Sequence, residues 1–338
     1  MTETHCPYCA LQCAQRLAGT PLTAQPRAFP TSNGGLCQKG WTSTDLLRVP
    51  DRLTTPLRRT RSGFVPVGWD AALDDIADRV RALQSAFGPD AVAVFGGGGL
   101  TNEKAYQLGK FARLALRTRL VDYNGRFCMA SAAAAGNRAL GVDRGLPFPL
   151  TDLRDADAVL LLGSNLADTM PPAVQHLGPV RERGGLVVVD PRRSATARLT
   201  ADGAGEHLQL RPGTDLVLLL GLLHVILGAG LADLDYLRDR VDGLAEVRRG
   251  VAEWWPERVA AVTGVAEPQL RRVATLLADA AAHRGGAGVF VLTGRGAEQH
   301  VDGTDTVTAA INVALALGAV GAPRGGCLLY TSPSPRDS

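Results

Sequence analysis

Short apolar runs alternate along the chain with stretches that place apolar residues at helical spacing. The runs are typical of buried parallel strands and end in glycine or polar residues: residues 91–95 (AVAVF), 158–162 (AVLLL), 186–189 (LVVV) and 288–292 (GVFVL). Helical spacing occurs at residues 69–87, 102–117, 172–183, 215–227, 234–241, 267–282 and 306–317. This alternation predicts an α/β fold with doubly wound, Rossmann-like sheets.

The two ends of the chain differ in composition from the middle. Residues 1–52 are rich in Cys, Pro, Gly and Thr and lack helical periodicity, so we expect a small loop-rich module organised by a metal. We expect residues 53–122 to form part of a first α/β domain and residues 123–326 a second one. Residues 327–338 (CLLYTSPSPRDS) change abruptly to a Ser/Pro-rich segment. We expect them to be a non-native tail on a chain truncated near Gly326.

Charge and hydropathy exclude some classes of partner. The 338 residues carry 36 Lys and Arg against 33 Asp and Glu, without a run of five like charges, which gives no support for nucleic-acid or membrane-surface binding. The longest apolar stretch, residues 216–227, is short of the roughly 20 residues needed to cross a bilayer. Only MTETH precedes Cys6, which leaves no room for a secretory signal and favours a cytoplasmic protein.

Four of the six cysteines lie near the start of the chain and form the strongest motif. Their spacing is Cys6-x2-Cys9-x3-Cys13-x23-Cys37, three ligands on one tight loop and a fourth from a distance. Four soft thiolates match the four irons of a 4Fe-4S cluster. The alternative is structural zinc, to which His5 could be an additional ligand, although zinc sites usually pair their ligands as two short knuckles.

Two further features near glycines each allow two interpretations. Lys39 follows Cys37 by two residues, so it is either a solvated lysine or a cation beside the electron path that contacts a second cofactor. The glycine run at residues 96–99 is either a phosphate loop or a tight turn.

Seven segments together resemble the prokaryotic molybdopterin oxidoreductases, from about Thr4 to Gly326. They are HCPYCALQC, CQKGW, NGRFCMAS, GSNLADTMPP, VVVDPRRSATA, PGTDL and TGRGAEQH. Within that family the chain is most similar to the assimilatory nitrate reductases, with formate dehydrogenases as close relatives. The resemblance implies that residues 53–122 form a partial pterin-binding domain.

The resemblance also implies roles for individual residues. Cys128 would be the protein ligand to molybdenum; without the resemblance it would be read as a small buried residue. Met129 stands beside it where formate dehydrogenases tend to carry His, which favours nitrate. The implied pterin contacts are Lys39, Asn124, Gly163, Ser164, Asn165, Asp190, Gly213, Thr214, Asp215, Arg295 and Gln299.

Asp190 and the pair Met170-Pro171 lie in two of the segments that match the family. Asp190 would accept hydrogen bonds from a nucleotide, or else form a turn with Pro191. Met170-Pro171 stands where many relatives carry His-Pro, which leaves the backbone role of that loop intact.

The function implied is the reduction of nitrate to nitrite at molybdenum held by two molybdopterin guanine dinucleotides. Electrons would pass through the cluster beside Lys39 from ferredoxin, flavodoxin or an NADH-linked flavoprotein. The alternatives are a formate dehydrogenase with the same cofactors and an electron-transfer subunit without molybdenum. Because the family continues into a C-terminal barrel, we expect the 338-residue chain to be inactive by itself.

Overall fold

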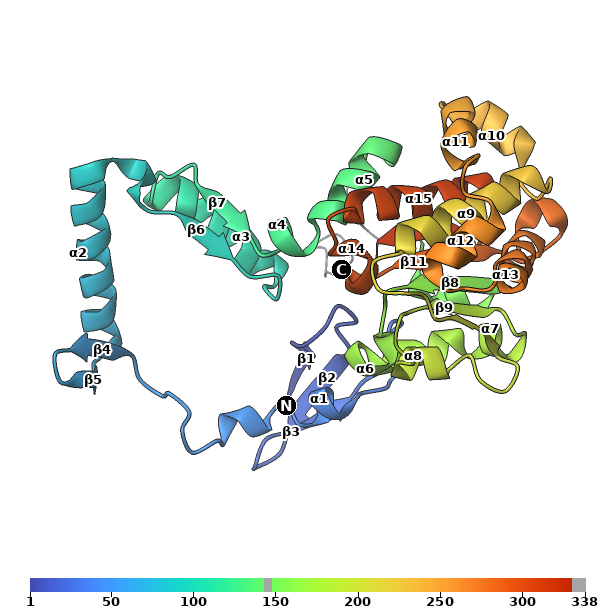
Figure 1. Cartoon of the computed structure of the whole chain (residues 1–338). Coiled ribbons are helices and arrows are strands. Elements are labelled where there is room, and N and C mark those ends of the chain that lie inside the picture. The colour runs from blue at the N-terminus through green and yellow to red at the C-terminus, as the bar shows by residue number, and fades with distance from the viewer. Residues whose placement is uncertain (143–147, 330–338) are drawn as a thin grey trace.

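A five-stranded parallel sheet is the centre of the structure, a computed structural model that describes residues 1–142 and 148–329 (Figure 1). The strand order is β10-β9-β8-β11-β12. These strands are β8 (Ala158–Leu162), β9 (Leu186–Val189), β10 (Gly205–Leu208), β11 (Val289–Thr293) and β12 (Gly326–Leu329). The chain proceeds outward from β8 on one side and returns to β11 on the other, so the predicted α/β architecture with a parallel sheet is confirmed.

Each face of this sheet has its own hydrophobic core, because successive side chains of a strand point to opposite faces. Leu160 and Leu162 of β8 belong to one core, and Val159 and Leu161 to the other. Figure 1 shows helices covering both faces. On the first face lie α5 (Ala130–Leu140), α9 (Asp215–Gly228), α12 (Pro256–Thr263), α13 (Glu267–Asp279) and α15 (Gly303–Ala316).

The second face carries short helices and the N-terminal module. The helical elements are η4 (Leu150–Arg154), α6 (Leu166–Thr169), η5 (Pro171–Leu177), α7 (Gly178–Glu182) and α8 (Ala195–Arg198). Cys6, Cys13, Leu11 and Leu36 are buried in the same core as Leu161 of β8. The module is thus packed onto the sheet rather than tethered to it.

The N-terminal module has more regular structure than the expected loop-rich segment. Three antiparallel strands pair in sequence order, β1 (Thr2–His5), β2 (Ala14–Ala18) and β3 (Thr23–Pro26), and α1 (Gln38–Trp41) and η1 (Asp45–Leu47) follow. Strands of four or five residues are too short to show a clear alternation, and the edge strands β1 and β3 are largely exposed.

The segment between the module and α5 lies apart from the large sheet (Figure 1). It contains β4 (Leu57–Thr60), β5 (Gly63–Pro66), α2 (Trp69–Phe87), η2 (Pro89–Ala91), β6 (Val94–Gly96), α3 (Asn102–Lys110), η3 (Phe111–Ala115) and β7 (Val121–Tyr123). The parallel pair β6 and β7, joined through α3, is a small βαβ unit. The expected helix at residues 69–87 is confirmed as α2, but none of its 19 residues is buried.

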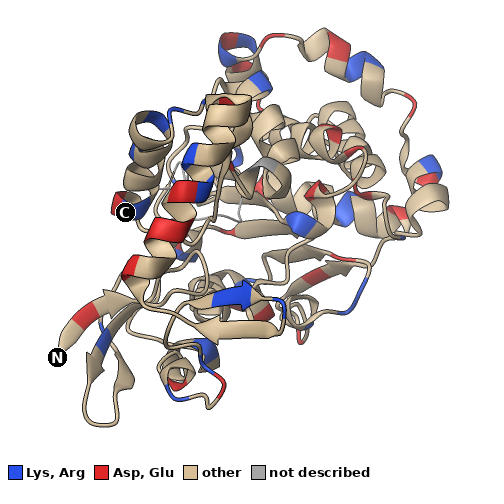
Figure 2. Cartoon of the chain, turned by 90° about the vertical axis from the view of Figure 1, so that its left-hand side faces the viewer, with Lys and Arg blue, Asp and Glu red and all other residues tan. Residues whose placement is uncertain are grey.

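The apolar stripe of α2 is not covered by any part of the chain that the structure describes. Trp69, Leu73 and Ile76 are 68%, 56% and 58% exposed, although their spacing is that of a core-facing helix stripe. Figure 2 shows both signs of charge scattered over the ribbon, without a large region of one sign.

Several predicted boundaries are corrected. Residues 327–329, which we expected to belong to a tail, form part of β12, where Cys327 pairs with Val291 of β11. Residues 330–338, the rest of the expected tail, lie outside the described part. The strand expected at residues 91–95 is β6, at Val94–Gly96. The helix expected at residues 102–117 is α3 followed by a π-helical turn, and that at 172–183 is η5 followed by α7.

The remaining helices are α4 (Gly125–Cys128), α10 (Leu234–Arg240), α11 (Leu244–Val251), η6 (Ala282–Arg284) and α14 (Arg295–Glu298). Among the helices within residues 1–142 and 148–329, none is both long and apolar enough to span a bilayer.

The contrast between buried α9 and exposed α2 predicts that the same Leu→Ala truncation destabilises the protein much more on α9 than on α2. Leu222 of α9 is 0% exposed in the first core, so Leu222→Ala should lower the free energy of unfolding by about 2–5 kcal/mol. Leu73→Ala is the matched control on α2 and should change it by about 0.5 kcal/mol or less. Urea unfolding followed by circular dichroism measures both; equal losses would show that α2 is buried in solution.

Candidate functional site

A hollow of about 590 Å³ lies where the N-terminal cysteine loop meets the carboxyl ends of β8, β9 and β11. In open α/β sheets, ligands bind at this edge, next to the point where the strand order reverses. The lining comes from the N-terminal module and from the loops that follow the three strands: Tyr8, Cys9, Ala10, Lys39, Gly163, Ser164, Asn165, Thr169, Met170, Asp190, Pro191, Arg192, Gly294, Arg295 and Gly296.

Glycines bring the loops after β8 and β11 into backbone contact. Gly163 has φ +57°, and a Cβ there would lie 2.2 Å from the amide nitrogen of Ala297. A Cβ at Gly294 would lie 2.7 Å from the carbonyl oxygen of Gly163, which accepts a hydrogen bond from the Gly296 N–H at 2.9 Å. One side of the hollow is therefore built largely from tightly packed backbone, at positions where only glycine fits.

The four N-terminal cysteines lie together beside the hollow. Cys6 and Cys13 are buried, and the Cys6 N–H donates to the Cys13 carbonyl at 2.8 Å. Burial raises the pKa of the Cys6 and Cys9 thiols and that of Cys13 to about 11, and neighbouring cysteines add to each rise. Within the described ranges, no three His, Cys, Asp or Glu side chains are close enough to bind one metal ion.

Lys39 joins the cysteine loop to the sheet. Its Nζ donates a hydrogen bond to the carbonyl oxygen of Thr169 at 3.0 Å, and the side chain lines the hollow. Its positive charge also lowers the pKa of Cys6 and Cys9, opposing the effect of burial. The ammonium group thus faces both the cysteines and the space at the sheet edge.

Cys128 lies next to Met129, which contacts a residue that lines the hollow. It is half-buried at the end of α4 and does not line the hollow itself. Met129 is 1% exposed, and its Sδ contacts the guanidinium of Arg295, which does line the hollow.

Arg295 is held by a buried carboxylate that the sequence did not reveal. Glu298 is 0% exposed and accepts hydrogen bonds from Arg295 and from the Thr293 hydroxyl, the latter at 2.6 Å. Burial raises the pKa of Glu298, and the Arg295 charge opposes that rise. In the segment TGRGAEQH the glutamate looks like an ordinary exposed helix acid, so no local signal marks it.

Two expected pterin contacts use their side chains within the protein. One oxygen of Asp190 accepts the Arg192 N–H at 2.8 Å, which is the turn interpretation of this residue. The Asn165 side chain accepts from Thr196 and donates to Asp168 at 2.8 Å. These loops offer mainly backbone and Ser164 to a ligand.

The remaining expected contacts lie outside the hollow. Asn124 belongs to the β6–β7 unit, where a Cβ on Gly98 would lie 3.0 Å from its Oδ1. Gln299 is exposed. Gly213 and Thr214 precede Asp215 at the start of α9, and Asp215 is only 6% exposed. Conversely, sequence reasoning missed Arg192, Gly294 and Gly296, which the residues following β9 and β11 could have indicated.

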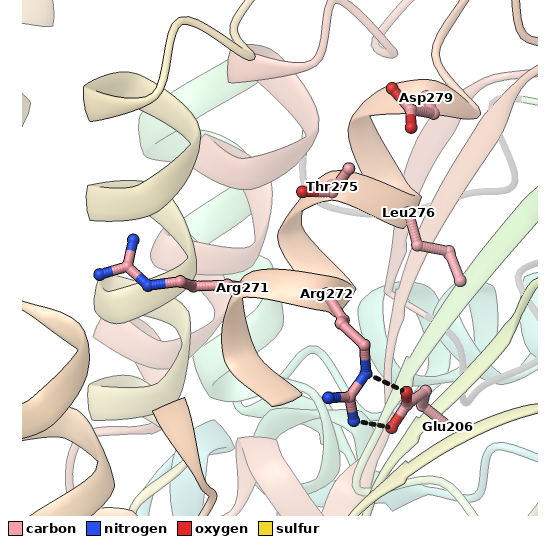
Figure 3. Close-up of a pocket in the computed structure, with 6 residues that line it drawn as sticks. All are labelled: Glu206, Arg271, Arg272, Thr275, Leu276 and Asp279. Carbon is pink, nitrogen blue, oxygen red and sulfur yellow. Dashed lines mark hydrogen bonds and ion pairs between the residues drawn. The ribbon is translucent and has the colours of Figure 1, made fainter. Parts of the chain in front are cut away.

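A second hollow, between β10 and α13, offers no chemistry of its own (Figure 3). Two of its charged side chains pair with each other, since Arg272 Nε lies 3.0 Å from Glu206 Oε1. The other two, Arg271 and Asp279, pair with Glu267 and Arg284. It contains no cysteine or histidine.

Comparison with known proteins identifies the family. Residues 52–331 match the family described as "Molybdopterin oxidoreductase". The chain belongs to the molybdopterin oxidoreductase family. Over 331 residues, 96% of this chain and 45% of the relative, it is 35% identical to the "Assimilatory nitrate reductase catalytic subunit" of Bacillus subtilis (strain 168).

Other relatives within the family have different names. The "Formate dehydrogenase H" of Escherichia coli (strain K12) is 32% identical over 334 residues, 96% of this chain and 45% of the relative. The fold matches "Acetylene Hydratase from Pelobacter acetylenicus" with a TM-score of 0.78 and 22% identity, covering 94% of this chain and 43% of that one. The chain therefore spans about half the length of these relatives.

Asp215 should make this molybdopterin oxidoreductase chain less stable as pH rises. Burial raises the pKa of Asp215 from 3.8 to about 6, so the folded state retains a proton that the unfolded chain loses. Stability should fall between about pH 4 and 6, and Asp215→Asn should remove a penalty on the order of 2–3 kcal/mol at pH 7. Urea unfolding at pH 4 and pH 7 measures this, with the exposed Asp279→Asn as control; parallel profiles for wild type and Asp215→Asn would contradict the assignment.

Proposed function

We propose that this chain is part of the catalytic subunit of an assimilatory nitrate reductase, which reduces nitrate to nitrite at a molybdenum bis(molybdopterin guanine dinucleotide) centre fed by a 4Fe-4S cluster. The observation that carries the proposal is the position of Lys39, between the four-cysteine loop and the glycine-rich sheet edge. An electron path needs two redox groups close together, and these two sites share that side chain.

The arrangement of the cysteines fits a cluster better than a single zinc ion. Zn–S bonds of about 2.3 Å would place pairs of sulfurs roughly 3.8 Å apart. Cys6, Cys9 and Cys37 all act electrostatically on Cys13, so the four thiols are neighbours. Three thiols on one tight loop and a fourth from a distance are the pattern that suits a four-iron cubane.

The hollow fits the phosphate-bearing part of a pterin dinucleotide. A Cβ at Gly163, Gly294 or Gly296 would collide with the facing loop, so these glycines let the two loops pack tightly and present main-chain groups to the hollow. Lys39, Arg192 and Arg295 supply positive charge around that surface. Asp215, if it meets the cofactor in the whole protein, would accept hydrogen bonds from a guanine base.

In this mechanism the bound molybdenum centre supplies the two-electron chemistry that converts nitrate and two protons to nitrite and water. Cys128 would ligate the metal through its thiolate. Glu298 keeps Arg295 against Met129, so that a cation stays beside the metal ligand and the cofactor. Lys39 would offset the negative charge that accompanies each electron leaving the cluster. The donor would be ferredoxin, flavodoxin or an NADH-linked flavoprotein, and the protein would be cytoplasmic.

Formate oxidation by the same cofactors is the second candidate, supported by the 32% identity to the Escherichia coli formate dehydrogenase. Met129 favours nitrate, because formate dehydrogenases tend to carry His beside the metal ligand.

Assays of the full-length protein distinguish these functions. We expect nitrate reduction with a reduced viologen dye and no formate oxidation. Cys128→Ser should abolish nitrate turnover and retain the iron, because Cys128 lies outside the cysteine cluster. Formate oxidation by the wild type would contradict the substrate, and full activity of Cys128→Ser would contradict the metal ligand.

A further inference from the structure

The segment that returns the chain to Cys37 is clamped between the cysteine loop and the large domain. The Ser32 carbonyl accepts hydrogen bonds from Gln175 Nε2 and from the Gly35 N–H, both at 2.7 Å. The Thr31 carbonyl accepts from His176 Nε2 at 2.8 Å, and the Thr31 hydroxyl donates to the Leu11 carbonyl at 2.5 Å. The backbone of Ser32 is therefore fixed on both sides.

His176 makes this clamp rigid. It is 0% exposed, and Arg154 Nε donates to its Nδ1 at 3.2 Å, so Nε2 carries the proton that is donated to Thr31. Burial and the Arg154 charge lower the pKa of His176, which keeps this neutral form. The position of Ser32 relative to the cysteines is thus set by the large domain.

The hydrogen bonds to residues 31 and 32 use backbone carbonyls and the Thr31 hydroxyl, and they leave the Ser32 hydroxyl without a partner. The side chain is 0% exposed, and its Oγ has no hydrogen-bond partner, sulfur included, among the described residues. The Thr31–Leu11 hydrogen bond brings Ser32 beside the loop that carries Cys13. The Ser32 side chain lowers the pKa of the Cys13 thiol, because an O–H near sulfur stabilises the thiolate. A buried hydroxyl needs an acceptor, and the Cys13 sulfur, whose thiolate this side chain stabilises, is the acceptor that we assign to it.

We propose that the Ser32 hydroxyl donates a hydrogen bond to the Cys13 sulfur when that sulfur ligates the cluster, and that this bond raises the cluster's reduction potential. The inference rests on the proposed cluster. Reduction adds one electron, supplied by the external donor, and increases the negative charge on the sulfurs; no bond breaks and Ser32 keeps its proton. A donor to sulfur stabilises the reduced form more than the oxidised one. Ser32 is therefore a positioning residue for electron entry.

Redox titration of the full-length holoenzyme, followed by electron paramagnetic resonance, tests the proposal. Ser32→Ala should shift the ratio of reduced to oxidised cluster toward the oxidised form by about three- to tenfold at a fixed potential; a tenfold shift is 59 mV for one electron. Ser43→Ala is the matched control, since the Ser43 hydroxyl lies in the same module but contacts Gln15, at 3.5 Å. The control should leave the potential unchanged.

An unchanged potential in Ser32→Ala, with its iron retained, overturns the proposal and leaves the cluster itself intact. If Ser32→Ala loses the cluster, Ser32→Cys decides, because a thiol is a weaker donor of similar size. A potential below that of the wild type supports the hydrogen bond, and an equal potential overturns it. Wild-type protein without iron and sulfide would instead refute the proposed function, and this inference with it.

Discussion

The packing of the N-terminal module against one face of the parallel sheet is the interaction on which the site depends. Side chains of β8 alternate between two cores, and the core on the second face includes Cys6 and Cys13 together with Leu161. Burial of the cysteine loop against strands and short helices places it at the same sheet edge as the glycine loops. Without this shared core, Lys39 could not reach the loop after β8.

Hydrogen bonds fix the orientation of the N-terminal module on the sheet. Apolar contact alone is non-directional, whereas His176, Gln175 and Lys39 each connect a side chain to a particular carbonyl across the boundary. The close approach of Gly163 and Gly294 fixes the opposite wall. The hollow is therefore defined by rigid backbone on one side and by the clamped cysteine module on the other.

Local patterns predicted some elements well. The strands β8 and β9 and the helix α2 have the expected bounds, because a fully apolar run or a helical stripe is visible in a few consecutive residues. The spacing of the four cysteines likewise predicted that they would lie together. The chemistry of each residue type was sufficient for these features.

Features that depend on distant neighbours could not be predicted. The short strands of the N-terminal module lack a pattern, and the role of Glu298 appears only when Thr293 and Arg295 surround it. The sequence predicted that the Asn165 side chain contacts a ligand, whereas in the structure its oxygen accepts a hydrogen bond from Thr196, which is distant in sequence. The exposed stripe on α2 shows the converse: its sequence has the pattern of a core helix, although no described residue covers it.

Metal analysis of the 338-residue protein, prepared anaerobically with iron and sulfide, tests the central claim most directly. The account predicts equal amounts of iron and inorganic sulfide, about four of each per chain. It also predicts their loss in Cys37→Ser, because that residue provides the remote ligand. One zinc ion per chain, without sulfide and without displacement by iron, would contradict it.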